Sequence, residues 1–72
     1  MEDENSADMW NNKGYALYKL GKNDEAITCY DKAIEIEPNE VCMWLVKGLA
    51  LDKLGKNDEA KKCYDRAREL KK

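Results

Sequence analysis

Apolar residues recur along this chain at intervals of three and four positions, which is the spacing of one face of an amphipathic α-helix. The first half of the chain holds two such series, one made of Trp10, Gly14, Leu17 and Leu20 and the other of Ala26, Tyr30, Ala33 and Ile36. The second half repeats this arrangement. The pattern predicts an all-α chain with four helices near residues 7–20, 24–37, 41–54 and 58–71.

Glycine and asparagine mark the turn inside each pair of helices. Gly21 and Gly55 stand where the first helix of each pair should stop, and glycine readily adopts the left-handed conformation that closes a helix. Asn23 and Asn57 come two residues later, where a side-chain oxygen can accept a hydrogen bond from the free amides of the next helix. We therefore predict that both asparagines are N-caps.

Pro38 separates the two pairs of helices. The residue before a proline is disfavoured in helical geometry, so the second helix should end near Glu37, and Asn39 is the expected N-cap of the third. The chain then divides into an acidic N-terminal segment at residues 1–6, a first unit at 7–40 and a second unit at 41–72.

The two units are copies of one another, displaced by 34 positions. The stretch from Lys19 to Ala26 returns as the stretch from Lys53 to Ala60 without a mismatch. Self-similarity at this period is typical of stacked helical hairpins, in which each unit buries its apolar face against a neighbour. The sequence therefore predicts an internal duplication of one helix-turn-helix unit.

Charge and composition exclude several classes of function. Charged residues make up 39% of the chain, but the formal net charge is only -2, so no overall positive field attracts nucleic acid or an anionic membrane. The longest apolar run, from Val41 to Val46, is far shorter than the roughly 20 residues that span a bilayer. Glu2, Asp3 and Glu4 are unlike a basic signal or transit peptide, and we expect a cytoplasmic protein.

The residues that usually hold metals or perform catalysis are scarce. The chain has no histidine, and its three cysteines show no CxxC spacing, so no metal site, cofactor or disulfide framework is predicted. Cys29, Cys42 and Cys63 are interpreted as small apolar residues of a reduced protein, with an intermolecular disulfide at Cys42 as the alternative. Without a phosphate-binding glycine loop or an isolated acid pair, we predict that the protein is not an enzyme.

Both units resemble the tetratricopeptide repeat family, whose pattern places a tryptophan before a glycine, a second glycine in the turn and small residues on the second helix. The matching residues of the first unit are Trp10, Gly14, Leu17, Gly21, Ala26, Tyr30, Ala33 and Pro38. Those of the second unit are Trp44, Gly48, Leu51, Gly55, Ala60, Tyr64 and Ala67. The units depart from the pattern at Asn23 and Asn57, where the family has an aromatic residue, and at Lys13 and Lys47, where it has leucine.

This resemblance implies a right-handed superhelical stack of two antiparallel helical hairpins, with a concave groove lined by the first helix of each unit. Family members bind peptide segments in this groove, so the resemblance predicts a protein-interaction scaffold. The groove positions carried over to this chain are Asn11, Asn12, Tyr15, Tyr18, Lys19, Leu45, Val46, Leu49, Asp52 and Lys53. The two units differ at four of these five equivalent pairs, all but Lys19 and Lys53, as two halves of a binding surface would.

Two interpretations of this groove remain open. Tyr15, Leu45, Val46 and Leu49 would form an apolar patch that suits a side chain of a protein or peptide partner. In the alternative, the N-terminal segment covers the patch, or a second copy of the chain fills the groove and the protein is a self-associating homodimer or exchanges helices. Stacks of this kind normally need about three units, so self-association would supply cover that two units lack.

The last predicted helix is more polar than its counterpart in the first unit. Lys61 and Arg68 stand where the first unit has Ile27 and Ile34. Because the exposed end of a stack needs a polar face, we interpret this helix as a solubilising cap with no further unit after it. A docking patch for an anionic partner is the alternative interpretation of its lysines and arginines.

Overall fold

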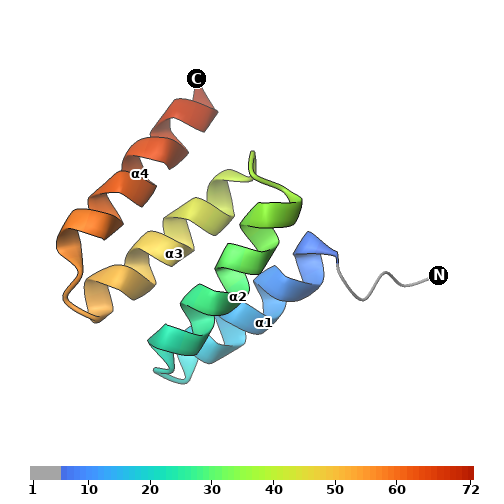
Figure 1. Cartoon of the computed structure of the whole chain (residues 1–72), viewed down its shortest axis with the longest axis vertical. Coiled ribbons are helices and arrows are strands. Elements are labelled where there is room, and N and C mark those ends of the chain that lie inside the picture. The colour runs from blue at the N-terminus through green and yellow to red at the C-terminus, as the bar shows by residue number, and fades with distance from the viewer. Residues whose placement is uncertain (1–5) are drawn as a thin grey trace.

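The structure is a computed structural model that describes residues 6–72, and all its regular elements are helices (Figure 1). They are α1 (Ala7–Lys19), α2 (Asn23–Ile36), α3 (Val41–Lys53) and α4 (Asn57–Lys71). The predicted all-α fold is confirmed, and every predicted boundary lies within one residue of the observed one. Apart from Ser6, the acidic segment expected at residues 1–6 lies outside the described residues.

The helices form two hairpins that stack on one another. α1 packs against α2 and α3 packs against α4, while α3 lies between α2 and α4 and joins the hairpins (Figure 1). α1 also contacts α3, and these two helices run in the same direction because each helix reverses the direction of the one before it. The molecule is accordingly flat, with extents of 39 × 31 × 15 Å.

Glycine ends both first helices, as predicted. Gly21 has a φ of 84° and Gly55 a φ of 81°, in the left-handed region that favours glycine. The amide of the residue after Gly21, Lys22, donates to the carbonyl of Leu17 at 2.9 Å, and the second hairpin repeats this bond at the same length. These bonds use carbonyl groups that the last helical turn would otherwise leave without partners.

The prediction that asparagines cap α2 and α4 is wrong. Lys22 and Lys56 occupy the two cap positions, and neither side chain makes a capping hydrogen bond. Asn23 and Asn57 are already the first residues of the helices, one position after the caps. The side chain of Asn57 instead donates to a residue of α3.

The other helix starts also differ from expectation. Asn39 is not a cap, because α3 follows Glu40, whose side chain makes no capping bond. Ser6 does cap α1, since its Oγ accepts a hydrogen bond from the amide of Met9 at 3.2 Å. A serine at this position is a favourable cap, and sequence reasoning assigned it only to the acidic segment.

Small residues separate the helices of each hairpin and let tyrosine rings fill the space. A Cβ placed on Gly14 would lie 3.1 Å from the ring of Tyr30, which is the largest fully buried side chain. A Cβ on Gly48 would lie only 2.6 Å from Cε1 of Tyr64. Each glycine is therefore required by the direct contact of a tyrosine ring with its backbone.

The tryptophans lie at the edges of the two core clusters and are partly buried. Trp10 packs against the cluster of Ala7, Ala33 and Met43. Trp44 packs at the edge of the second cluster, and its Nε1 donates a hydrogen bond to the carbonyl of Pro38 at 2.8 Å. This bond connects α3 to the segment between the hairpins.

The glycine contacts predict unequal effects of two matched substitutions. We expect Gly48→Ala to lower the free energy of unfolding by about 1–3 kcal/mol, because the new methyl group would overlap the ring of Tyr64. Gly14→Ala should cost less, since its nearest ring atoms are farther away, whereas the gain of about 1 kcal/mol in helix propensity is common to both variants. Urea unfolding of both variants would check this. A Gly48→Ala variant as stable as the parent would contradict the packing described above.

Candidate functional site

The ten residues predicted to line a groove lie on α1 and α3. Three residues of each helix form a stripe, because intervals of four and three positions return to one helical face. The stripes are Asn11, Tyr15 and Tyr18 on α1 and Leu45, Leu49 and Asp52 on α3. Since α1 and α3 are parallel and in contact, we call the surface formed by these two stripes the α1–α3 face.

The middle of the α1–α3 face is apolar and open to solvent. The exposed fraction of the residue is 49% for Tyr15, 38% for Leu45 and 43% for Leu49. Val46 is half-buried beside them, and Asn12 is exposed on the α1 side. Three large apolar residues are thus exposed at neighbouring positions of one face.

The end of the face at the C-termini of α1 and α3 combines tyrosines with lysines. Tyr15 and Tyr18 stack with their ring centroids 6.4 Å apart, and the ammonium group of Lys19 lies 5.7 Å from the Tyr15 centroid. Lys53 is exposed at the equivalent position of α3. Aromatic stacking and the cation–π contact hold the Tyr15 ring in place without covering it.

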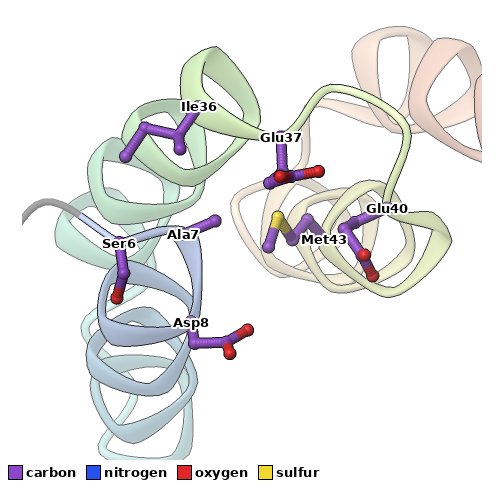
Figure 2. A pocket seen from close by; sticks show the side chains of 7 residues that line it. All are labelled: Ser6, Ala7, Asp8, Ile36, Glu37, Glu40 and Met43. Carbon is purple, nitrogen blue, oxygen red and sulfur yellow. The ribbon is translucent and has the colours of Figure 1, made fainter. Parts of the chain in front are cut away.

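A pocket of about 380 Å³ lies at the opposite end, where α1 and α3 begin (Figure 2). Its lining residues are Ser6, Ala7, Asp8, Ile36, Glu37, Glu40 and Met43. Figure 2 shows the carboxylates of Asp8 and Glu37 beside the space between the two helices, with that of Glu40 on the far side of Met43 from α1. Asp8 is three residues before Asn11 and so continues the α1 stripe, which gives the α1–α3 face an acidic end and a lysine-bearing end.

Sequence reasoning did not find this acidic pocket. Glu37 and Glu40 flank Pro38 in the connection between hairpins, and only the fold brings them next to the start of α1. The only sequence feature that indicated this pocket was the pair of acidic residues on the two sides of the proline. Within residues 6–72, no group of three or more histidine, cysteine, aspartate or glutamate side chains is arranged to hold a metal ion.

A polar network fixes the lysine-bearing end of the face in the second hairpin. Asp52 accepts one hydrogen bond from Nδ2 of Asn57 and another from Oη of Tyr64, each 2.8 Å long. The bond from Asn57, followed by that from Tyr64, holds the pKa of Asp52 below its usual value. Burial, and then the bond to Asp52, raises the pKa of Tyr64 to about 12, and Tyr18 contributes a smaller increase from across the face.

The first hairpin lacks this network because Tyr18 stands at the position equivalent to Asp52. The counterparts of Tyr64 and Asn57 are Tyr30 and Asn23. Oη of Tyr30 and Oδ1 of Asn23 are buried and have no hydrogen-bond partner among residues 6–72. Burial raises the pKa of Tyr30. Tyr18 thus leaves the buried hydroxyl of Tyr30 without the acceptor that Asp52 supplies to Tyr64, which is unfavourable.

Comparison with known proteins identifies the repeated unit. Two family profiles, both described as tetratricopeptide repeat, match residues 7–40 and residues 43–72. The chain belongs to the tetratricopeptide repeat family. Repeats of this family generally mediate protein–protein interactions, and the proteins that carry them are typically scaffolds rather than enzymes.

A solved tetratricopeptide-type structure supports this assignment. The chain is 34% identical to the protein in the crystal structure of MamA, with a TM-score of 0.87, and the match covers 90% of this chain. It covers 38% of the MamA chain, so the present chain spans well under half the length of that protein. No curated protein matches the sequence.

Other general features of this tetratricopeptide repeat protein bear on its setting. No helix in the described part of the chain is long and apolar enough to cross a membrane. All three cysteines are free thiols, with Cys29 and Cys63 buried and Cys42 exposed. Burial raises the pKa of the Cys63 thiol, which keeps it protonated and unreactive.

The unsatisfied hydroxyl of Tyr30 predicts a stabilising substitution. We expect Tyr18→Asp to raise the free energy of unfolding by about 1 kcal/mol, because the new carboxylate would accept a hydrogen bond from Oη of Tyr30 as Asp52 does from Tyr64 in the second repeat. The gain is partly offset by loss of the Tyr15 stacking contact. Thermal and urea unfolding would measure it, with Asp52→Tyr as the reciprocal variant, expected to be less stable than the parent. A Tyr18→Asp variant less stable than the parent would contradict the proposed equivalence.

The lowered pKa of Asp52 predicts a dependence of stability on acid. Its carboxylate is favoured in the folded state, so its contribution is fully present above the pKa of an unfolded aspartate and is lost as the pH falls through the lower folded-state pKa. Urea unfolding between pH 7 and pH 2 would compare the parent with Asp52→Asn, which cannot ionise. The stability difference between them should shrink at the acidic end; a constant difference would mean that the ionised carboxylate is not what the network stabilises.

Proposed function

We propose that this tetratricopeptide repeat protein is a non-catalytic scaffold that binds a peptide segment of another protein on its α1–α3 face. The observation that carries the proposal is the joint exposure of Tyr15, Leu45 and Leu49 at the centre of that face. Clustered apolar residues with a polar rim are typical of protein interaction sites. Tyrosine in particular offers a large contact area with little conformational freedom to lose on binding.

The rim charges favour one chemical pattern in the bound segment. An apolar side chain would cover Leu45 and Leu49, and a lysine or arginine on one side of it would lie near the acidic pocket at Asp8 and Glu40. Lys19 and Lys53 at the other end favour a carboxylate. Complementary charges of this kind set the direction and register of a bound segment more than its affinity.

The three free thiols fit a reducing compartment, and we propose that the protein acts in the cytoplasm. Thiols that remain reduced allow Cys42, at the start of α3, to stay exposed without forming a covalent link to another chain.

The test is a peptide-display selection on the parent protein, followed by affinity measurements of the selected peptides on variants. We expect Leu45→Asp and Leu49→Asp to weaken binding at least tenfold, because each places an unpaired charge in the apolar centre of the interface. Leu20→Asp is the matched control: it makes the same change at an exposed leucine that directly follows α1 and lies off the α1–α3 face, and should leave affinity unchanged.

Two results would count against this function. Equal binding by the parent and both groove variants would place the interface elsewhere. Sedimentation of the parent over a range of concentrations tests the alternative, in which a second copy occupies the face. A tight dimer that Leu49→Asp converts to a monomer would favour the self-associating module over the scaffold.

A further inference from the structure

One face of α1 repeats, residue for residue, the face by which α3 packs against the first repeat. We call it the α1 outer face, and it consists of Met9, Lys13, Ala16, Leu17 and Leu20. The equivalent residues of α3 are Met43, Lys47, Ala50, Leu51 and Leu54. All five residue types are identical. The α1 outer face lies on the other side of the helix from Tyr15, so it is separate from the α1–α3 face.

The two copies of this face differ sharply in burial. Met43 and Ala50 are 2% and 0% exposed, whereas Met9 is 39% exposed and Ala16 is exposed on the helix surface. Leu20 is 72% exposed, the largest value among the exposed apolar side chains. The hairpins are otherwise alike, so the difference in burial has a simple cause. The first repeat covers this face of α3, whereas no described residue covers the equivalent face of α1.

The structure also shows what covers the buried copy. Three residues of α2, spaced four and three positions apart, face α3 and meet its residues in antiparallel order. The contacts are Ile27 with the cluster around Leu51, Asp31 with Lys47 through a 2.5 Å ion pair, and Ile34 with the cluster around Met43. The cover is therefore one helical stripe with an aliphatic residue at each end and a carboxylate between them.

The exposed copy is already arranged for the same contacts. The ammonium group of Lys13 lies 5.5 Å from the Trp10 ring centroid, as that of Lys47 lies 5.8 Å from the Trp44 centroid. Leu17 and Trp10 line a shallow pocket of about 240 Å³ between α1 and α2, equivalent to the one beside Leu51. Lys13 therefore has the position at which α3 meets Asp31, while the hollow beside Leu17 corresponds to one that stays open beside Leu51, between α3 and α4.

We propose that the α1 outer face docks an amphipathic helix of a partner protein, with aliphatic residues at positions i and i+7 and an aspartate or glutamate at i+4. The helix runs antiparallel to α1. Its first aliphatic side chain covers Leu17, its carboxylate pairs with Lys13, and its second aliphatic side chain covers Met9. The buried α2–α3 contact in the same molecule is the template for this complex.

A second copy of the chain does not supply such a helix. The matching stripe of α2 is already covered by α3, and the matching stripe of α4 carries Lys61, Asp65 and Arg68. Asp65 pairs with Arg68 at 3.2 Å, and the two cations would have to be buried against Leu17 and Met9. Pairing of two α1 outer faces would bring Lys13 against its own copy. The charges thus favour a different protein.

The test uses a hydrocarbon-stapled helical peptide that displays isoleucine, aspartate and isoleucine at i, i+4 and i+7, because an unconstrained helix of this length is marginal in water. Binding is followed by NMR of the methionine methyl groups. We expect a saturable shift of the Met9 signal while that of Met43 stays unchanged. Lys13→Glu should weaken binding at least tenfold, and a peptide with lysine in place of the aspartate should restore binding to that variant.

Matched controls separate this surface from the α1–α3 face. Lys61→Glu makes the same charge change on α4 and should leave the affinity unchanged, and Leu49→Asp should do the same. Loss of peptide binding in Leu49→Asp, unchanged affinity in Lys13→Glu, or no shift of Met9 at millimolar peptide would each overturn the proposal. Concentration-dependent broadening of the Met9 signal without peptide would assign the face to a second copy and overturn it as well.

Discussion

The contact of a tyrosine ring with a glycine backbone is the constraint on which the rest of this structure depends. Tyr30 against Gly14, and Tyr64 against Gly48, set how closely the two helices of each repeat approach. The core is built largely of alanine, whose short side chain contacts a neighbouring helix only when that helix lies close. The close approach of the two helices therefore allows these alanines to be buried. A chain of 72 residues has little other apolar area to compensate for a wider gap. The same spacing then fixes which residues of α1 and α3 remain exposed.

The two repeats keep this scaffold but differ on the surface that it presents. Asp52 completes a hydrogen-bond network with Asn57 and Tyr64, whereas Tyr18 leaves the hydroxyl of Tyr30 in the first repeat without an acceptor. The unsatisfied hydroxyl lowers stability, and the ring of Tyr18 enlarges the aromatic surface beside Tyr15. Residues that lower stability while extending an exposed apolar surface are expected where selection acts on binding rather than on folding.

The sequence was sufficient to predict the helices and the turns, because these depend on local periodicity and on two glycines whose backbone conformation has few alternatives. It failed where the partner of a side chain comes from another helix. Asn57 bonds to Asp52 across the turn instead of capping α4, and the acidic pocket combines the starts of α1 and α3 with Glu37. The residues that the family resemblance predicted for a groove lie on α1 and α3, but the sequence could not show that Leu45 and Leu49 stay exposed.

Because the chain is an internal duplication, equivalent residues of the two repeats can be compared directly. The comparison shows that the two ends of the stack are chemically different. The α4 end has lost the aliphatic residues that α2 uses to seat a neighbouring helix, since Lys61 and Arg68 replace Ile27 and Ile34. The α1 end has kept every residue type that α3 uses to accept one. A polar end stays in water at little cost, whereas exposed methionine and leucine gain free energy when a helix covers them. Because one end is polar and the other is not, copies cannot add head to tail without burying charge. Association at the α1 end would therefore stop after one partner helix rather than grow into a filament.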